Sequence, residues 1–486
     1  MVVVVLLGTS ISSPLVPLKA AGNHSSRIGL PPDAASPLPE EALSKQSKEI
    51  SDGEDKPHTR HRSGLRCGRS HARPWDGLGC RSSKGHKLHV PRLPGHRQGI
   101  VKWRFQVSGQ YVLHRPAVGP DGGVVVGSSS GDVYSLTAGG TLRWVIRAGS
   151  DGGPSIGPDG TVYVASGSTI KAITPAGSIR WTYTEPSVGQ GVIAGPTVGP
   201  DGNIYVISDW GGLGAFALSP AGQLVWSNPG SPMFSEYGQL GAELVFGSGR
   251  LYAAFDEYAV APSTMFGVSL GGSQHWARTL GGSDDMFMQQ QRQPATGSDG
   301  SLYLTAMGGA NGWSLNRVDP SSGNVLWNYS PWPSNGMSAP SVGPNGSVFL
   351  SRSLSYLESV TPSGQSRWTF TDGSIIDHPA VSPNGSVVVA GDRPNFGEPG
   401  YIRGWNAATG ALSWQVSLPN ENGGYQVAYT QPRFSANSAT AYVGTAVLGG
   451  GDQYSYLYAV DTGITPRPQC GTGSSTRCRP SATLAP

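Results

Sequence analysis

The chain has 486 residues, of which 71 are glycine and 39 are proline, and 37% of its residues are hydrophobic. This length and apolar content allow one large repeat domain or two to four domains of average size. Glycine and proline mark tight turns, so their abundance favours many short strands, and no stretch has the periodicity of a long amphipathic helix.

Charge is distributed unevenly, although the formal net charge is only +3. Lys56 to Arg104 contain thirteen basic residues and one acidic residue, whereas the chain from Phe105 onward contains seventeen basic and twenty-three acidic residues. The basic character therefore belongs to the leader. The mildly acidic remainder argues against nucleic acid as a partner.

The chain begins with a short apolar run, Met1 to Leu7, followed by small and polar residues. This run resembles a fragment of a signal peptide and is too short to span a bilayer, so we expect no transmembrane segment and favour a secreted or extracytoplasmic location. Most of residues 1–98 is rich in Pro, Ser, Arg and His, which predicts a disordered leader or reflects a misplaced gene start. Residues 466–486 are expected to form a disordered tail.

All four cysteines lie in these two terminal segments, at Cys67, Cys80, Cys470 and Cys478. The last two are close enough for a local disulfide in an oxidising compartment, and free thiols are the alternative. No cysteine can therefore cross-link the region between the two segments.

Residues 99–465 contain a tandem repeat. A copy opens with a proline, continues with a turn such as GPDG and an alternating segment such as VYV, and ends in a short segment carrying a tryptophan. Each copy therefore reads as four short strands, with the first two joined by a hairpin turn. Eight structural tryptophans mark the fourth strands: Trp103, Trp144, Trp181, Trp226, Trp276, Trp327, Trp368 and Trp414.

The two ends of the repeat region complement each other. The copy that opens at Pro432 stops near Gly463 without a tryptophan strand, while Ile100 to Phe105 is a tryptophan strand with no copy before it. Joined, they make one further sheet, and closure removes the free edges of an open array. We therefore predict an all-β fold, an eight-bladed β-propeller of four-stranded antiparallel blades closed by the N-terminal strand.

The segments RVDPSSGNVLW (Arg317 to Trp327), WNAATGALSW (Trp405 to Trp414) and AVDTG (Ala459 to Gly463) resemble the tryptophan-docking pattern of the pyrroloquinoline-quinone (PQQ) propeller repeat. This resemblance covers about three quarters of the chain. The family includes quinoprotein alcohol dehydrogenases, an outer-membrane assembly lipoprotein and stress-sensor luminal domains, so the fold alone names no activity.

The enzymes of that family carry adjacent cysteines beside the quinone and a Glu, Asn and Asp calcium set beside a catalytic Asp. The repeat region has no cysteine, and no segment matches the calcium set. We therefore predict no cofactor and no catalytic residue, and expect a monomeric, non-catalytic scaffold that binds a protein, peptide or glycan through one face. A PQQ-dependent oxidoreductase with calcium, or another small-molecule enzyme, is the alternative.

The residues just before the opening prolines are the candidate site, because the loops that carry them meet at one mouth of the central channel. Two His, two Arg and an Asp there could bind an anion or polarise a carbonyl, and the alternative is that they line a wet channel. The candidates are His114, Arg115, Arg292, Asp377, His378 and Gln431.

Long loops supply further candidates. Asp284 and Asp285 could join a cation site or lie in a solvated loop. Trp210, together with Trp332 in a blade-to-blade loop, could contribute to an aromatic rim for a partner, and taken singly such aromatics are ordinary.

Overall fold

A computed structural model describes residues 97–107, 114–150, 152–186, 196–207, 215–228, 238–239, 244–257, 263–280, 293–309, 312–332, 336–353, 355–393, 398–421, 423–448 and 454–465. The chain divides into two units, Met1–Leu88 and His89–Pro486, and all described residues belong to the second. Within the described ranges, no helix is long and apolar enough to cross a membrane.

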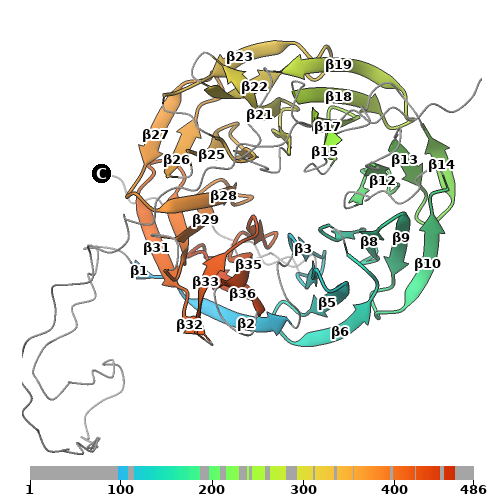
Figure 1. The fold of residues 1–486 in the computed structure, drawn as a ribbon, viewed down its shortest axis with the longest axis horizontal. Helices are drawn as coiled ribbons and strands as arrows, with labels where there is room; N and C mark the ends of the chain where they lie inside the picture. Colours follow the sequence, from blue (N-terminus) through green and yellow to red (C-terminus); the bar gives the residue numbers. More distant parts are fainter. Residues whose placement is uncertain are drawn as a thin grey trace, which may run out of the picture. The chain divides into compact units, whose positions relative to one another are not determined.

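The strands form eight antiparallel blades in a ring (Figure 1), which confirms the predicted eight-bladed β-propeller. Blade 1 consists of β3 (Ala117–Val118), β4 (Val124–Gly127), β5 (Asp132–Leu136) and β6 (Leu142–Arg147). Blade 2 consists of β7 (Ser155–Ile156), β8 (Val162–Ser166), β9 (Thr169–Ile173) and β10 (Ile179–Thr184). Blade 3 consists of β11 (Thr197–Val198), β12 (Ile204–Ile207), β13 (Ala215–Leu218) and β14 (Leu224–Ser227). Blade 4 consists of β15 (Gly238–Gln239), β16 (Val245–Gly247), β17 (Arg250–Glu257), β18 (Ser263–Ser269) and β19 (Gln274–Leu280).

The second half of the ring repeats this arrangement. Blade 5 consists of β20 (Ala295–Thr296), β21 (Leu302–Gly309), β22 (Gly312–Val318) and β23 (Val325–Tyr329). Blade 6 consists of β24 (Ser341–Val342), β25 (Val348–Arg352), β26 (Tyr356–Val360) and β27 (Ser366–Phe370). Blade 7 consists of β28 (Ile375–Val381), β29 (Val387–Arg393), β30 (Tyr401–Asn406) and β31 (Leu412–Ser417). Blade 8 consists of β32 (Asn420–Glu421), β33 (Gly424–Ala428), β34 (Arg433–Phe434), β35 (Thr440–Leu448), β36 (Ser455–Asp461) and the N-terminal strand β2 (Val101–Val107).

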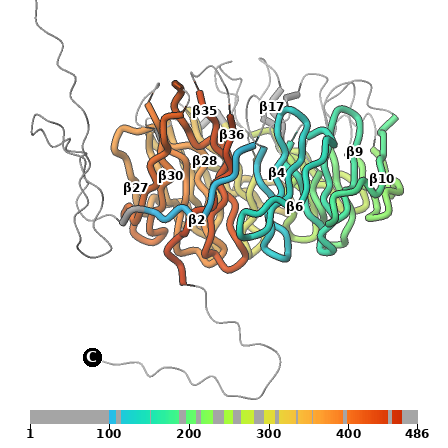
Figure 2. The backbone as a smooth tube through the Cα atoms, turned by 90° about the horizontal axis from the view of Figure 1, so that it is seen from below, coloured from blue at the N-terminus to red at the C-terminus, as the bar shows by residue number. Residues whose placement is uncertain are grey.

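Blade 8 closes the ring as predicted. Strand β2 pairs antiparallel with β36, with Trp103 opposite Ala459. The Lys102 ammonium adds hydrogen bonds to the Ala439 carbonyl (2.9 Å) and the Thr440 hydroxyl (2.8 Å). Figure 2 shows β2 running beside β36 at the seam where the two ends of the propeller meet. Strand β36 is thus paired on both sides, with β35 and with β2.

The described structure begins two residues before the predicted propeller boundary. Strand β1 (Arg97–Gln98) pairs in parallel with β31 of blade 7, and the Gly99 amide donates to the Gln415 carbonyl at 2.7 Å. A Cβ on Gly99 would overlap side chains of β31, so glycine permits this close approach. Arg97 and Gln98 are therefore corrected from the leader to the propeller.

The turn between the first two strands forms for a local reason. In blade 1 the Gly122 amide donates to the Gly119 carbonyl (2.9 Å) with φ of 77° at Gly122, and the Asp121 carboxylate accepts the Gly123 amide (2.9 Å). Aspartate or asparagine thus fixes the turn, and glycine supplies the positive φ.

The apolar core lies between blades. Eight clusters of buried side chains occupy the eight interfaces between neighbouring blades, with most members on the second and third strands. The eight predicted structural tryptophans sit on the fourth strands and join these interfaces: each indole donates a hydrogen bond to a carbonyl of the next blade. The acceptors, from Trp103 to Trp414, are Ala138, Pro175, Pro220, Leu270, Pro320, Pro362, Ala407 and Thr462.

Candidate functional site

The residues before the opening prolines differ in side-chain size, although they occupy equivalent places in the repeat. The residue before the opening proline has a long polar side chain in blades 1, 5, 7 and 8, whereas it is Gly153 in blade 2 and Ala339 in blade 6. The four polar positions are Arg115, Gln293, His378 and Gln431.

Arg115 spans the channel. Its Nη1 donates to Oε1 of Gln293, which precedes the first strand of blade 5, and to Oε1 of Gln431 at 3.3 Å. Blades 1 and 5 stand opposite each other in the ring (Figure 1). Gln431 in turn donates from Nε2 to the Pro379 carbonyl at 3.4 Å. One guanidinium therefore links side chains from three blades.

His378 sits at an irregularity in the first strand of blade 7. The pairing register between β28 and β29 shifts between Asp377 and Ala380, and His378 has a φ of 36°. Bulges of this kind redirect side chains and are common beside functional sites. The His378 Nε2 is buried and has no hydrogen-bond partner among the described residues.

Burial changes the pKa values of the basic side chains in the cluster. Burial lowers the pKa of Arg115 well below its usual range, and the nearby charge of Arg433 lowers it further. Burial also lowers the pKa of Arg433 to about 10. The pKa of His378 is lowered by burial and by Arg115, against an opposing effect of Asp377. Two guanidiniums thus share a poorly solvated space with a neutral imidazole.

The predicted site residues have different outcomes. The structure brings Arg115, His378 and Gln431 together and places Asp377 beside His378. His114 instead continues the blade 1 backbone pairing, with its amide donating to the Gly127 carbonyl at 3.0 Å. Four further candidates lie outside the described residues: Trp210, Asp284, Asp285 and Arg292.

Two members of the cluster, Gln293 and Arg433, are not among the site residues predicted from the sequence. Arg433 had a usable signal, because the residue after the opening proline is Ala, Ser or Thr in six other blades. Gln293 occupies the same position before the proline as Arg115. Its contact with Arg115 depends on the width of the ring, so no pattern in the sequence around Gln293 predicts that contact.

A cavity of about 390 Å³ adjoins the cluster. The first strands and their turns in blades 5 to 8 line it, and Arg433 is the one charged residue among the described residues on its wall. Its volume falls within the range of small-molecule pockets. Gln431 belongs both to this wall and to the contacts of Arg115.

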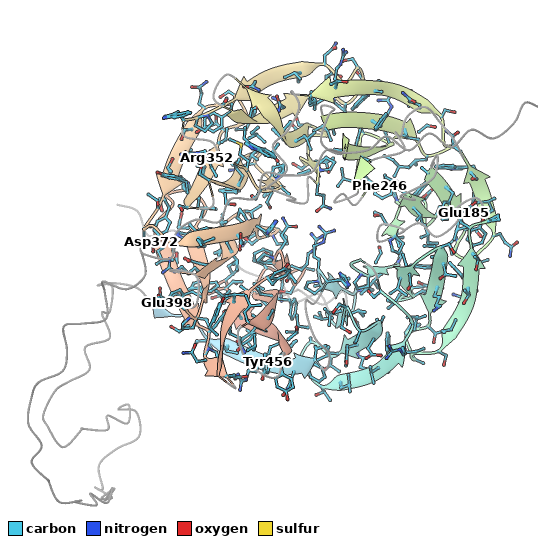
Figure 3. All side chains as sticks on the ribbon, in the orientation of Figure 1. Glu185, Phe246, Arg352, Asp372, Glu398 and Tyr456 are labelled. Carbon is cyan, nitrogen blue, oxygen red and sulfur yellow. The ribbon has the colours of Figure 1, made fainter. Side chains whose placement is uncertain are left out.

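A second group of buried charges lies away from the channel and is internally paired. In blade 6, Arg352 contacts Glu358 at 2.8 Å. At the entry to blade 7, Arg403 contacts Asp372 at 2.7 Å and also Asp392. Arg352 and Asp372 are labelled in Figure 3. Each of these arginines is paired with at least one carboxylate of its own group, so we treat the group as structural.

The residues present do not fit a quinone–calcium site. In the parts of the chain that the structure describes, no three His, Cys, Asp or Glu side chains lie close enough together to hold a metal ion. All four cysteines lie outside the described ranges. The cluster at Arg115 therefore does not reproduce the donor set of the quinoprotein dehydrogenases.

Comparison with known proteins agrees with the repeat. A family model described as outer membrane protein assembly factor BamB matches residues 95–329. A search of curated proteins finds no match. BamB from Moraxella catarrhalis is similar in structure, with 16% identity, a TM-score of 0.51, and coverage of 72% of this chain and 99% of that chain.

Two other propellers are similar in fold. Quinohemoprotein alcohol dehydrogenase from Comamonas testosteroni has 13% identity and a TM-score of 0.53, covering 76% of this chain and 77% of that chain. The Dos1 propeller has 12% identity and a TM-score of 0.54, covering 74% of this chain and 95% of that chain. Identities this low show the fold alone. The family model and the repeat itself support a similarity of this chain to PQQ-like β-propellers.

Proposed function

We propose that this chain is a non-catalytic scaffold that binds a protein partner outside the cytosol, through the propeller face that carries the blade-to-blade loops. The observation that carries the proposal is Trp332. Its side chain is 76% exposed, the highest value among the large apolar residues that the structure describes. An indole left in water at a loop is typical of an interaction surface.

The position of Trp332 matches this role. It lies in the connection between β23 of blade 5 and β24 of blade 6, and the channel residue Arg115 precedes the first strand of blade 1. Tyr429, 51% exposed, precedes β34 of blade 8. Exposed aromatic side chains and the channel residue Arg115 thus lie in the same kind of connection, the one between neighbouring blades.

The family model supports a protein as the partner. Its description is that of an assembly factor, and the matched segment, residues 95–329, contains every strand of the first five blades. We therefore favour a protein over a peptide or a glycan. The apolar run at Met1 to Leu7 supports the extracytoplasmic location.

Site-specific photocross-linking tests the proposal. A photoreactive amino acid replaces Trp332 in one variant and Val145 in a second, since Val145 is 50% exposed on the outer strand of blade 1. We expect a discrete adduct with one partner protein from position 332 in cells of the source organism, and none from position 145. No adduct from position 332, or the same adducts from both positions, would contradict the proposal.

A quinoprotein oxidoreductase is the second candidate, because the fold is shared with a quinohemoprotein alcohol dehydrogenase. Titration of the purified chain with PQQ and calcium distinguishes the two. A saturable change in quinone absorbance with a raised melting temperature would support the enzyme, since a ligand of the folded state must stabilise it. We expect neither change.

A further inference from the structure

The outer strands of the blades share one irregularity. In every blade the pairing register of the outer strand shifts at the residue just before the structural tryptophan. Charged side chains and bulges at a sheet edge discourage the addition of another strand. The bulge residue is apolar only in blades 3 and 5, where it is Val225 and Leu326. In the other six blades it is Lys102, Arg143, Arg180, His275, Arg367 or Ser413.

Blade 7 shows that such an edge can accept a strand. Strand β1 pairs in parallel with β31 at Trp414, directly after the bulge, and Gly99 packs closely against Trp414 and Val416. The Trp414 side chain is only 5% exposed. At the equivalent places of blade 5, Trp327 and Tyr329 are half-buried. An extended segment added after the bulge thus covers the tryptophan edge of a blade.

The outer edge of blade 5 is open and apolar. Among the described strands, β23 pairs only with β22. Leu326 is 54% exposed, and Val325 beside it is also exposed. Trp332 closely follows β23, so the apolar surface continues from the edge into the connection to blade 6. Blade 3 has a similar exposed pair, but within the described ranges only blade 5 joins such a pair to an exposed tryptophan.

We propose that β23 is a docking edge, to which the partner protein adds an extended apolar segment that continues from its contact with Trp332. The inference rests on the proposed scaffold function. In blade 7 the Gln415 carbonyl accepts the Gly99 amide, and Asn328 occupies the equivalent register place in blade 5. The Asn328 backbone therefore faces outward. Main-chain hydrogen bonds to an added strand supply affinity, and the flanking side chains supply specificity.

Photocross-linking from the edge tests the inference separately from the scaffold function. A photoreactive amino acid replaces Leu326 in one full-length variant and Arg180, the equivalent bulge residue of blade 2, in another. We expect position 326 to cross-link to the same protein as position 332, and position 180 to give no adduct.

An adduct from position 332 without one from position 326 overturns the docking edge and leaves the scaffold function standing. No adduct from either position overturns both proposals. Equal adducts from positions 326 and 180 overturn the docking edge. So does a cross-link from position 326 to a second copy of this chain or to its own N-terminal segment.

The variant Leu326→Arg tests the apolar bulge directly. Arginine stands at this place in blades 1, 2 and 6, so we expect the variant to fold with an unchanged far-ultraviolet spectrum. Its affinity for the purified cross-linked partner should fall at least about tenfold, because an added strand would cover the new charge. Val145→Arg is the matched control, since Val145 is exposed on the outer strand of blade 1, and its affinity should not change. Equal affinities of Leu326→Arg and the wild type would overturn the inference.

Hydrogen exchange distinguishes strand addition from a contact of side chains alone. In the complex of the full chain with the purified partner, we expect slower amide exchange along β23, including Asn328. The outer strand of blade 2 should exchange at the same rate in the free and bound protein. Unchanged exchange along β23 in a complex that protects the residues around Trp332 would overturn the inference.

Discussion

Trp103 and Ala459 are directly opposite each other in blade 8, although they come from the two ends of the propeller sequence. The Trp103 ring also lies 5.8 Å from the ring of Tyr442, and its indole donates to the Ala138 carbonyl of blade 1 at 2.9 Å. One side chain thus connects the N-terminal strand to both of the blades that it must hold together.

Trp103→Ala should therefore destabilise the propeller. Truncation of a large aromatic core residue costs about 3–5 kcal/mol, and the lower end applies here because the ring is only partly buried. Urea unfolding followed by tryptophan fluorescence checks this. Trp332→Ala is the control, since its exposed ring should contribute less than about 0.5 kcal/mol. Equal losses in the two variants would argue that closure does not depend on Trp103.

The closure of the ring by the N-terminal strand could be predicted from the sequence. Turn residues and tryptophans recur along the repeat, and the two incomplete end fragments together make one blade. The sequence does not predict β1, because two residues of parallel pairing leave no periodic pattern. Within the site, the positions of Arg115 and His378 follow from the opening prolines. The contact of Arg115 with Gln293 could not be predicted in this way, because it depends on whether the two side chains are long enough to meet across the ring.

Blades 6 and 7 carry buried ion pairs at equivalent positions with the charges exchanged. Arg352 and Glu358 occupy the register places that Asp392 and Arg403 occupy in the next blade. Glu358→Gln should cost about 3–5 kcal/mol, because it leaves the buried Arg352 charge without its carboxylate.

The double variant Arg352→Met/Glu358→Leu should lie much closer to the wild type in free energy of unfolding, since it removes both desolvated charges. Together with the single variants Arg352→Met and Glu358→Leu and the wild type, it completes a double-mutant cycle. The exposed Arg147→Gln provides a surface reference, expected within about 0.5 kcal/mol of the wild type. A double variant as unstable as Glu358→Gln would show that the side chains matter through packing rather than charge.

Arg115→Gln should raise the pKa of His378. The positive charge of Arg115 lowers this pKa in the folded protein, so its removal should favour the imidazolium, while burial continues to oppose it. Titration by NMR of labelled histidine checks the direction, with the His378 signal assigned from His378→Gln. Arg147→Gln should leave the pKa of His378 unchanged. An unchanged value in the Arg115→Gln variant would mean that the two side chains are not electrostatically coupled.

Asp392 should make the stability of the propeller depend on pH. Burial raises the pKa of Asp392 to about 7, because the single Arg403 guanidinium is shared with Asp372 and does not fully offset the loss of solvation. In the unfolded chain an aspartate has a pKa near 3.8. Between these two values the folded state binds more protons than the unfolded state, so the free energy of unfolding should fall as pH rises from about 4 to 7.

The variant Asp392→Asn isolates this effect, because contributions from the other titrating groups largely cancel in its difference from the wild type. That difference should shift in favour of Asp392→Asn from pH 4 to pH 7 and become constant above pH 7. Asp319→Asn is the control: hydrogen bonds from Ser321 and Ser322 lower the pKa of Asp319, so its effect should change only as pH falls below the unfolded value. A constant difference between Asp392→Asn and the wild type across the whole range would show that the Asp392 carboxylate stays ionised and fully compensated by Arg403.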